Sequence, residues 1–146
     1  SDDGATSMIE DREGNVWVAT RDGLNRLTPY KVTPILDLGL VNAVDVTPDG
    51  NVWVGTADAI VSFASGRMEA RSAAVGLPNP PLAAMHADRA GNLWVATARE
   101  LIRTRGGRLD RVLPLERLGL SEVTDITSDG ADGLWVHDSR SGLWRW

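Results

Sequence analysis

The sequence is notable first for what it lacks. It has no cysteine, only one lysine (Lys31) among 15 lysines and arginines, and no long apolar run. Without cysteine there is no disulfide framework and no thiolate metal site. No stretch approaches the roughly 20 apolar residues of a membrane helix, so we expect no direct insertion into a membrane. No segment combines ten residues of helical periodicity with capping residues, so we expect an all-β fold.

Several classes of function are disfavoured in the same way. The net charge of −5 argues against nucleic-acid binding, which needs a basic face. There is no Gly-x-Ser-x-Gly nucleophile motif, no glycine-rich phosphate loop and no calcium loop with its terminal glutamate. We therefore expect no catalysis by this chain, no bound metal and no cofactor.

What the sequence does contain is a repeat. The segments GNVWVAT, GNVWVGT, GNLWVAT and DGLWVHD occur in turn along the chain. The tryptophans of these copies are Trp17, Trp53, Trp94 and Trp135, which are 36, 41 and 41 residues apart. A regular period of about 40 residues is typical of repeat architectures.

The pattern inside each copy is that of short strands. In NVWVAT, Trp17 and Ala19 would lie on one face and Val16 and Val18 on the other, so both faces are apolar and both need to be covered. An Asp or Thr followed by Gly-Asn precedes this strand and predicts a tight turn. Further strands precede and follow, which gives about four short antiparallel strands per copy, the pattern of a β-propeller blade.

We therefore predict a single all-β domain over residues 1–146, a propeller segment of about four blades. Each blade is a four-stranded antiparallel sheet, except that the last lacks its outermost strand. The expected blades are approximately residues 1–40, 41–81, 82–122 and 123–146.

Uncovered end faces would be apolar, so we expect them to be covered by further propeller blades or by another copy of the chain. The repeated tryptophans are expected to pack between blades rather than to stack on sugars.

The first copy carries a resemblance to a known family. The stretch MIEDREGNVWVATRDGLNRL resembles the two-component regulator propeller repeat, in which an Asp-x-x-Gly-Asn-Leu-Trp-Val-Gly-Thr segment is followed by Gly-Leu-Asn-Arg. Copies two and three have AIVSF and LIRTR in place of that last segment, and copy four has His137 and Asp138 in place of a small residue and threonine. The resemblance implies a propeller in the extracytoplasmic, periplasmic sensor part of an inner-membrane two-component-type signalling protein.

By this resemblance the chain would be a non-catalytic, ligand-binding sensor module for a saccharide or another small polar ligand. We expect the ligand on the face that carries the turns between the second and third strands, where arginines and carboxylates alternate. The expected ligand-binding residues are Arg21, Asp22, Asp58, Arg99, Glu100, His137 and Arg140.

Two other functions stay open. The repeats are also similar to those of streptogramin lyase-like propellers, an enzyme class that would need a His/Glu acid–base pair and a metal, with His86 and His137 as the available histidines. The chain could instead be a structural propeller that mediates protein contacts.

Overall fold

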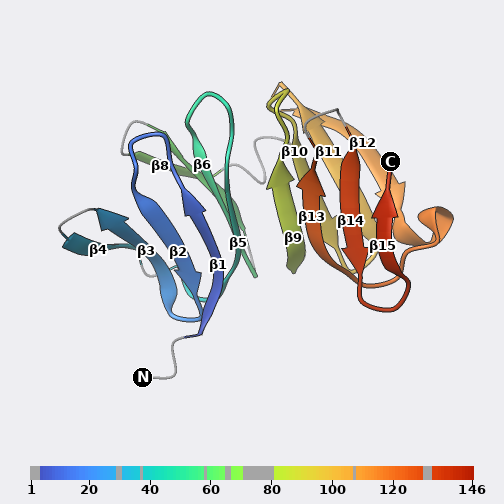
Figure 1. Cartoon of the computed structure of the whole chain (residues 1–146), viewed down its shortest axis with the longest axis horizontal. Helices are drawn as coiled ribbons and strands as arrows, with labels where there is room; N and C mark the ends of the chain where they lie inside the picture. The colour runs from blue at the N-terminus through green and yellow to red at the C-terminus, as the bar shows by residue number, and fades with distance from the viewer. Residues whose placement is uncertain are drawn as a thin grey trace.

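The computed structural model describes residues 4–28, 31–36, 38–57, 59–64, 67–70, 81–106, 108–129 and 133–146. In this part of the chain the fold is all-β, and the strands form four antiparallel sheets that stand side by side in chain order, as in a segment of a propeller (Figure 1). Three sheets have four strands and the fourth has three, as predicted. No helix within the described ranges is both long and apolar enough to cross a membrane.

The strands follow one another within each sheet without crossovers. The first sheet contains β1 (Ala5–Glu10), β2 (Val16–Thr20), β3 (Gly23–Thr28) and β4 (Lys31–Leu36). The second contains β5 (Val41–Val46), β6 (Val52–Thr56), β7 (Ile60–Ala64) and β8 (Arg67–Ala70). The third contains β9 (Leu82–Ala87), β10 (Leu93–Thr97), β11 (Glu100–Arg105) and β12 (Arg108–Pro114), and the fourth contains β13 (Val123–Ser128), β14 (Leu134–Asp138) and β15 (Gly142–Arg145).

One element was not expected. A short 3₁₀ helix, η1 (Leu115–Leu118), leads from β12 toward the fourth sheet. It ends at Gly119, whose φ of 74° lies in the left-handed region that favours glycine. Leu115 is buried and its backbone N–H donates to the carbonyl of Arg99 at 2.8 Å, so η1 is attached to the turn between β10 and β11.

The register is the same in every sheet. Each repeated tryptophan lies on the second strand and pairs with one residue of the first strand. These partners are Ile9, Asp45, His86 and Thr127. The first strands β1, β5, β9 and β13 each contact the next, so this position recurs along one row of neighbouring strands.

The cores lie between sheets rather than within one. Trp17, Ala19 and Leu24 of the first sheet pack with Val44 and Val54 of the second. The second and third sheets share a cluster that includes Ile60, Leu82 and Met85, and the third and fourth share one that includes Leu101, Val123 and Ile126. Strands that are apolar on both faces are thus covered by a neighbouring sheet on each side.

The outer faces of the first and fourth sheets are the exception. Met8 is 67% exposed, although the equivalent residues of the later sheets, Val44, Met85 and Ile126, are buried. Leu143 is 65% exposed, whereas Leu24, Ile60 and Leu101 at the corresponding position are buried. Two apolar faces therefore lie open at opposite ends of the stack.

Candidate functional site

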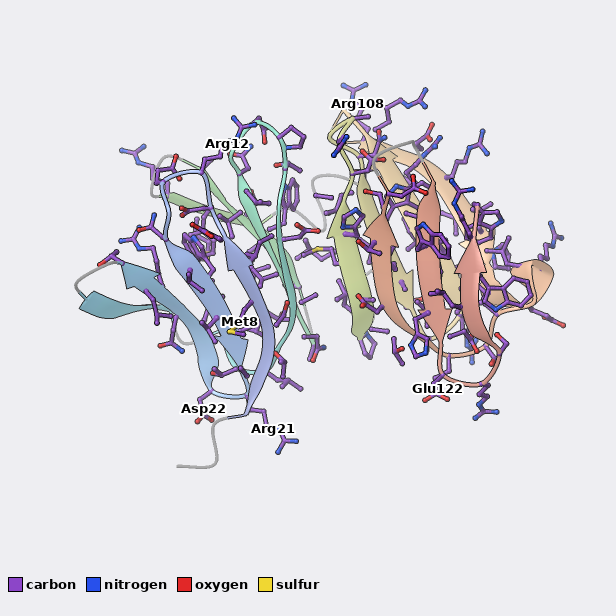
Figure 2. All side chains as sticks on the ribbon, viewed as in Figure 1. Met8, Arg12, Arg21, Asp22, Arg108 and Glu122 are labelled. Carbon is purple, nitrogen blue, oxygen red and sulfur yellow. The ribbon has the colours of Figure 1, made fainter. Side chains whose placement is uncertain are left out.

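The turns between second and third strands lie at one end of the sheets, which we call the rim. Arg21, Asp22 and Glu122 mark this end in Figure 2, and Arg12 and Arg108 mark the opposite end. In the first three sheets a threonine closes the turn by donating its hydroxyl to a backbone carbonyl. The threonines are Thr20, Thr56 and Thr97. The rim turns are therefore held by local hydrogen bonds, and Arg21, Arg99 and Arg140 beside them are exposed.

A cavity of about 700 Å³ opens at the rim where η1 meets the turn between β10 and β11. Arg99 and Glu100 line it, together with Glu116 and Ser121 from the connection to the fourth sheet. Arg99 is exposed and Glu100 half-buried. The guanidinium, the two carboxylates and the hydroxyl form a mixed polar wall, and Leu115 and Leu120 provide an apolar base.

The other predicted ligand residues are spread over the remaining turns. Arg21 and Asp22 belong to the first sheet, and Asp58 lies outside the described residues. Arg140 donates Nε–H to Glu122 at 3.1 Å, next to the cavity residue Ser121. The structure thus brings Arg99 and Glu100 into one cavity and places Arg140 beside it, and Arg21 and Asp22 belong to a separate turn.

His137 lies on a strand and not on a turn. It is in β14, on the exposed outer face of the fourth sheet, where it pairs with Leu143. Its Nδ1 is 2.7 Å from the hydroxyl of Thr124. The small residues at the same position in the other sheets, Ala19 and Gly55 among them, are covered by the next sheet.

Asp138 replaces the rim threonine in the fourth sheet and has a different role. Its carboxylate is fully buried and accepts the backbone N–H groups of Ser121 at 2.6 Å and Glu122 at 2.7 Å. It also accepts those of Arg140 and Ser141 within its own turn. The N–H groups of Glu122 and Ser121 hold the pKa of Asp138 far below its usual range. Asp138 therefore stays ionised and fixes the wall of the rim cavity.

The turns at the opposite end share a unit that the sequence pattern predicts only in part. Six residues before the tryptophan, an aspartate caps the turn and also accepts the indole N–H; Asp11 accepts from Trp17 at 2.7 Å. Asp88 and Asp129 do the same for Trp94 and Trp135. Burial acts to raise the pKa of Asp11, but hydrogen bonds from Trp17 and Asn15 outweigh it and lower that pKa.

An arginine completes this unit in three sheets. The cross-strand partner of the tryptophan places its guanidinium over the indole, with distances of 5.3–5.7 Å to the ring centroid. The arginines are Arg26, Arg103 and Arg145. The second sheet lacks both charges, because Thr47 accepts from Trp53 and Ser62 is its cross-strand partner. Alignment of the copies on tryptophan shows these arginines nine or ten residues later, so the signal was available in the sequence.

The tryptophans themselves lie where the stack of sheets requires them. Trp17 is 5% exposed within the cluster shared by the first two sheets, and Trp53 and Trp94 are half-buried against the next two clusters. Trp135 faces the open side of the fourth sheet, where only Arg145 lies over its ring among the described aromatic and cation contacts.

A polar chain crosses three sheets near this opposite end. Nδ1 of His86 is 2.9 Å from Oδ2 of Asp45, and its Nε2 is 2.8 Å from Oγ of Ser128. Asp45 Oδ2 also accepts the backbone N–H of Ala87 at 2.8 Å. The side chains of His86 and Asp45 are only 16% and 14% exposed. Of these three residues, only His86 was a candidate from the sequence.

Ser128 also lines a second cavity, of about 320 Å³, between the turns of the third and fourth sheets. Arg89, Arg103 and Arg105 are among its walls. Within the described residues, no group of three or more His, Asp or Glu side chains could hold a metal ion.

Comparisons with known proteins agree with the repeat and the fold. Residues 1–22 match the family model described as "Two component regulator propeller", which confirms the resemblance of the first copy. No curated protein matches the chain. The solved structures that resemble it include the extracellular domain of a B. thetaiotaomicron protein described as a one component system, BT4673, with a TM-score of 0.80, 17% identity, and coverage of 100% of this chain and 21% of that one.

Two further solved structures show the range of proteins with this fold. The extracellular domain of BT3049 from B. thetaiotaomicron, described as a hybrid two component system, has a TM-score of 0.75 at 20% identity over 95% of this chain and 21% of that one. A gluconolactonase, XC5397 from Xanthomonas campestris, has a TM-score of 0.72 at 19% identity over 99% of this chain and 58% of that one. The chain spans about a fifth of the first two structures, and at these identities the likeness shows the propeller fold alone.

Proposed function

We propose that this chain is a ligand-binding sensor propeller module of a bacterial two-component-type signalling protein, and that it binds its ligand at the rim. The observation that carries the proposal is the cavity of about 700 Å³ lined by Arg99 and Glu100, because it lies at the end of the sheets where the sequence predicts binding. The family match of residues 1–22 and the resemblance to extracellular sensor domains support the signalling role and a location outside the cytoplasm.

The cavity chemistry suits a saccharide or another small polar ligand. The Arg99 guanidinium offers several N–H donors, and Glu100 and Glu116 offer acceptors for hydroxyl groups. The apolar base at Leu115 and Leu120 can cover the C–H face of a sugar ring. An uncharged sugar or one with a single anionic group fits this mixture better than a multiply charged anion, which the carboxylates would repel.

Signal transmission would begin at the same wall. Ligand contacts to Glu116 and Ser121 would act on the segment that joins the third and fourth sheets. Asp138 anchors that segment through the N–H groups of Ser121 and Glu122. A ligand that alters this connection would change the position of the fourth sheet, whose outer face is available to a partner.

The two open faces support the partner part of the proposal. Met8 at one end of the stack and Leu143 at the other occupy positions that are buried in the internal sheets. A further propeller sheet or another copy of the chain would cover them and remove apolar surface from water, which is worth about 25 cal/mol per Å². If another copy of the chain covers these faces, Leu143→Asp should lower the mass measured by light scattering. If the wild type and the variant both have the mass of a monomer, further propeller sheets cover the faces instead.

Calorimetric titration with a panel of neutral and uronate oligosaccharides tests the rim. Arg99→Ala should weaken binding of the active sugar at least about 10-fold, the effect of losing one charged hydrogen bond. Arg12→Ala is the matched control, because Arg12 is an exposed arginine on the opposite end of the sheets. Binding that responds equally to both variants, or to neither, would contradict a rim site.

The resemblance to a gluconolactonase supports the enzyme alternative. A lyase-like mechanism that used His86 and His137 together would require them to share a site. The two histidines have different hydrogen-bond partners. His86 bonds Asp45 and Ser128, whereas His137 bonds Thr124 on the outer face of the fourth sheet. Lyase assays with added divalent metals should therefore give no activity that depends on both histidines.

A further inference from the structure

The arrangement of Asp45, His86 and Ser128 has a chemical meaning beyond packing. A carboxylate only accepts hydrogen bonds, so in the neutral imidazole the proton sits on Nδ1, 2.9 Å from Asp45. Nε2 is then an acceptor, and the Ser128 hydroxyl 2.8 Å away is the donor. The order carboxylate, imidazole, hydroxyl is the arrangement that activates serine for nucleophilic attack.

The carboxylate is itself held in place. Its Oδ2 also accepts the N–H of Ala87, the residue that follows His86 on β9, at 2.8 Å. Asp45 therefore bonds both the backbone and the ring of the same strand, which fixes the ring orientation. Both side chains are mostly buried, so few water molecules compete for these hydrogen bonds.

Ser128 borders a cavity. It is half-buried at the end of β13, and it lines the cavity of about 320 Å³ between the third and fourth sheets. Arg105 lines the same cavity, and its guanidinium group is a donor for a developing oxyanion or for an anionic substituent. Arg103 also lines it, but its Nε–H and Nη2–H already donate to Asp110. Two aspartates complete the wall: Asp88 accepts N–H groups of its own turn, and Asp129 is paired with Arg145.

We infer that Ser128 is a nucleophile for acyl transfer, activated by His86 and positioned through Asp45, and that its substrates are small esters or lactones that carry a carboxylate. This site is separate from the rim, because it lies among the turns at the opposite end of the sheets. It adds a covalent chemistry that no local motif of the sequence indicates.

The reaction balances with water as the only co-substrate. Ser128 Oγ attacks the ester carbonyl while its proton passes to Nε2 of His86. The carbon–oxygen bond to the leaving group then breaks, and the proton from His86 goes to the departing alcohol oxygen. In the second half, His86 takes a proton from water, the hydroxide displaces Oγ from the acyl carbon, and Ser128 regains its proton as the carboxylic acid leaves.

Labelling of the whole chain with a fluorophosphonate, followed by peptide mapping, is the direct test. The expected result is a single adduct on Ser128, formed at least about 100-fold more slowly in His86→Gln, since the general base is then lost. An adduct on a different serine, no adduct, or an equal rate in His86→Gln overturns the inference. The wild-type result needs no variant, so it stands even if a substitution impairs folding.

Turnover is tested with 4-nitrophenyl hemisuccinate and 4-nitrophenyl acetate. We expect a stoichiometric burst of nitrophenol from the hemisuccinate that is absent in Ser128→Ala and present in Ser7→Ala. Ser7 is the matched control because it is a half-buried serine on a first strand, β1, that pairs with Ala19. Arg105→Ala should reduce the preference for the anionic ester. A burst that persists in Ser128→Ala contradicts the assignment.

Asp45 is a positioning residue, and its test separates that role from a structural one. Asp45→Asn should slow labelling about 100-fold or more, because the amide favours the wrong imidazole tautomer, and should change the pH profile of labelling. A purely structural Asp45 would lower the unfolding midpoint and leave that pH profile unchanged, which would remove Asp45 from the site.

Discussion

The boundary between the first two sheets and the boundaries among the last three are built differently, although the same repeat supplies both. At the first boundary Ile9 stands opposite Trp17, and the contact is an apolar cluster that includes Phe63, whose ring centroid is 5.7 Å from that of Trp17. At the later boundaries the equivalent positions carry Asp45 and His86, which hydrogen-bond across the sheets. Apolar clusters hold the later boundaries as well, and there the same strand position adds hydrogen bonds between the sheets.

The largest expected effect lies at the apolar boundary. Trp17→Ala should lower the free energy of unfolding by about 3–5 kcal/mol, because it removes a buried indole and leaves a cavity between two sheets. Trp146→Ala is the control, since Trp146 is 47% exposed, and should change it by less than about 1 kcal/mol. Urea denaturation followed by circular dichroism measures both. Equal losses would mean that the first boundary does not depend on Trp17.

A smaller effect is expected where the second sheet meets the third. A Cβ on Gly55 would lie 2.8 Å from two methyl carbons of Leu82. Gly55→Ala should therefore destabilise the chain by about 1–3 kcal/mol, as overpacking does. Gly4→Ala is matched to it, because nothing lies within 4 Å of a Cβ there. If Gly55→Ala left the free energy of unfolding unchanged, this boundary would tolerate alanine, the residue at the equivalent position 19. The first and second boundaries would then be more alike than we infer.

The link between the third and fourth sheets should respond to pH. The folded pKa of Asp138 is lowered by the N–H groups of Glu122 and Ser121, so its contribution to stability is complete above the unfolded value of about 3.9 and is lost as pH falls toward the folded value. Asp138→Asn should thus be destabilising at pH 7, and the difference from the wild type should shrink at pH 3. Urea midpoints at the two pH values check this, and a difference that grows in acid would reverse the assigned sign.

Much of this architecture is readable from the sequence, for a physical reason. Strands that are apolar on both faces, with a tryptophan at a fixed place and Gly-Asn turns before it, have few stable arrangements other than stacked sheets. The left-handed φ values of Gly14, Gly50 and Gly91 come from the predicted turns. The same reasoning predicted a rim site that includes Arg99 and Glu100, and these two residues line one cavity because they are neighbours in the chain.

The parts that were missed depend on contacts between sheets. Asp45, His86 and Ser128 are 41 and 42 residues apart, so no local motif reveals them, and the repeat period itself brings them together. When the copies are aligned on their tryptophans, Asp45, His86 and Thr127 fall in one column. This shared column is the only feature of the sequence that indicates a contact between Asp45 and His86. It does not show that Ser128, one residue beyond that column, is the third member, because this depends on the side-chain directions at the end of β13.

The central claim is that stacked repeats bring residues about 41 positions apart into contact along one row of first strands. A double-mutant cycle of Asp45→Ala and His86→Ala, measured by urea unfolding, tests it most directly. We expect a coupling free energy of about 1 kcal/mol or more, the value for a pair that shares a hydrogen bond. Additivity within about 0.3 kcal/mol would show that the two side chains do not meet and would contradict the account.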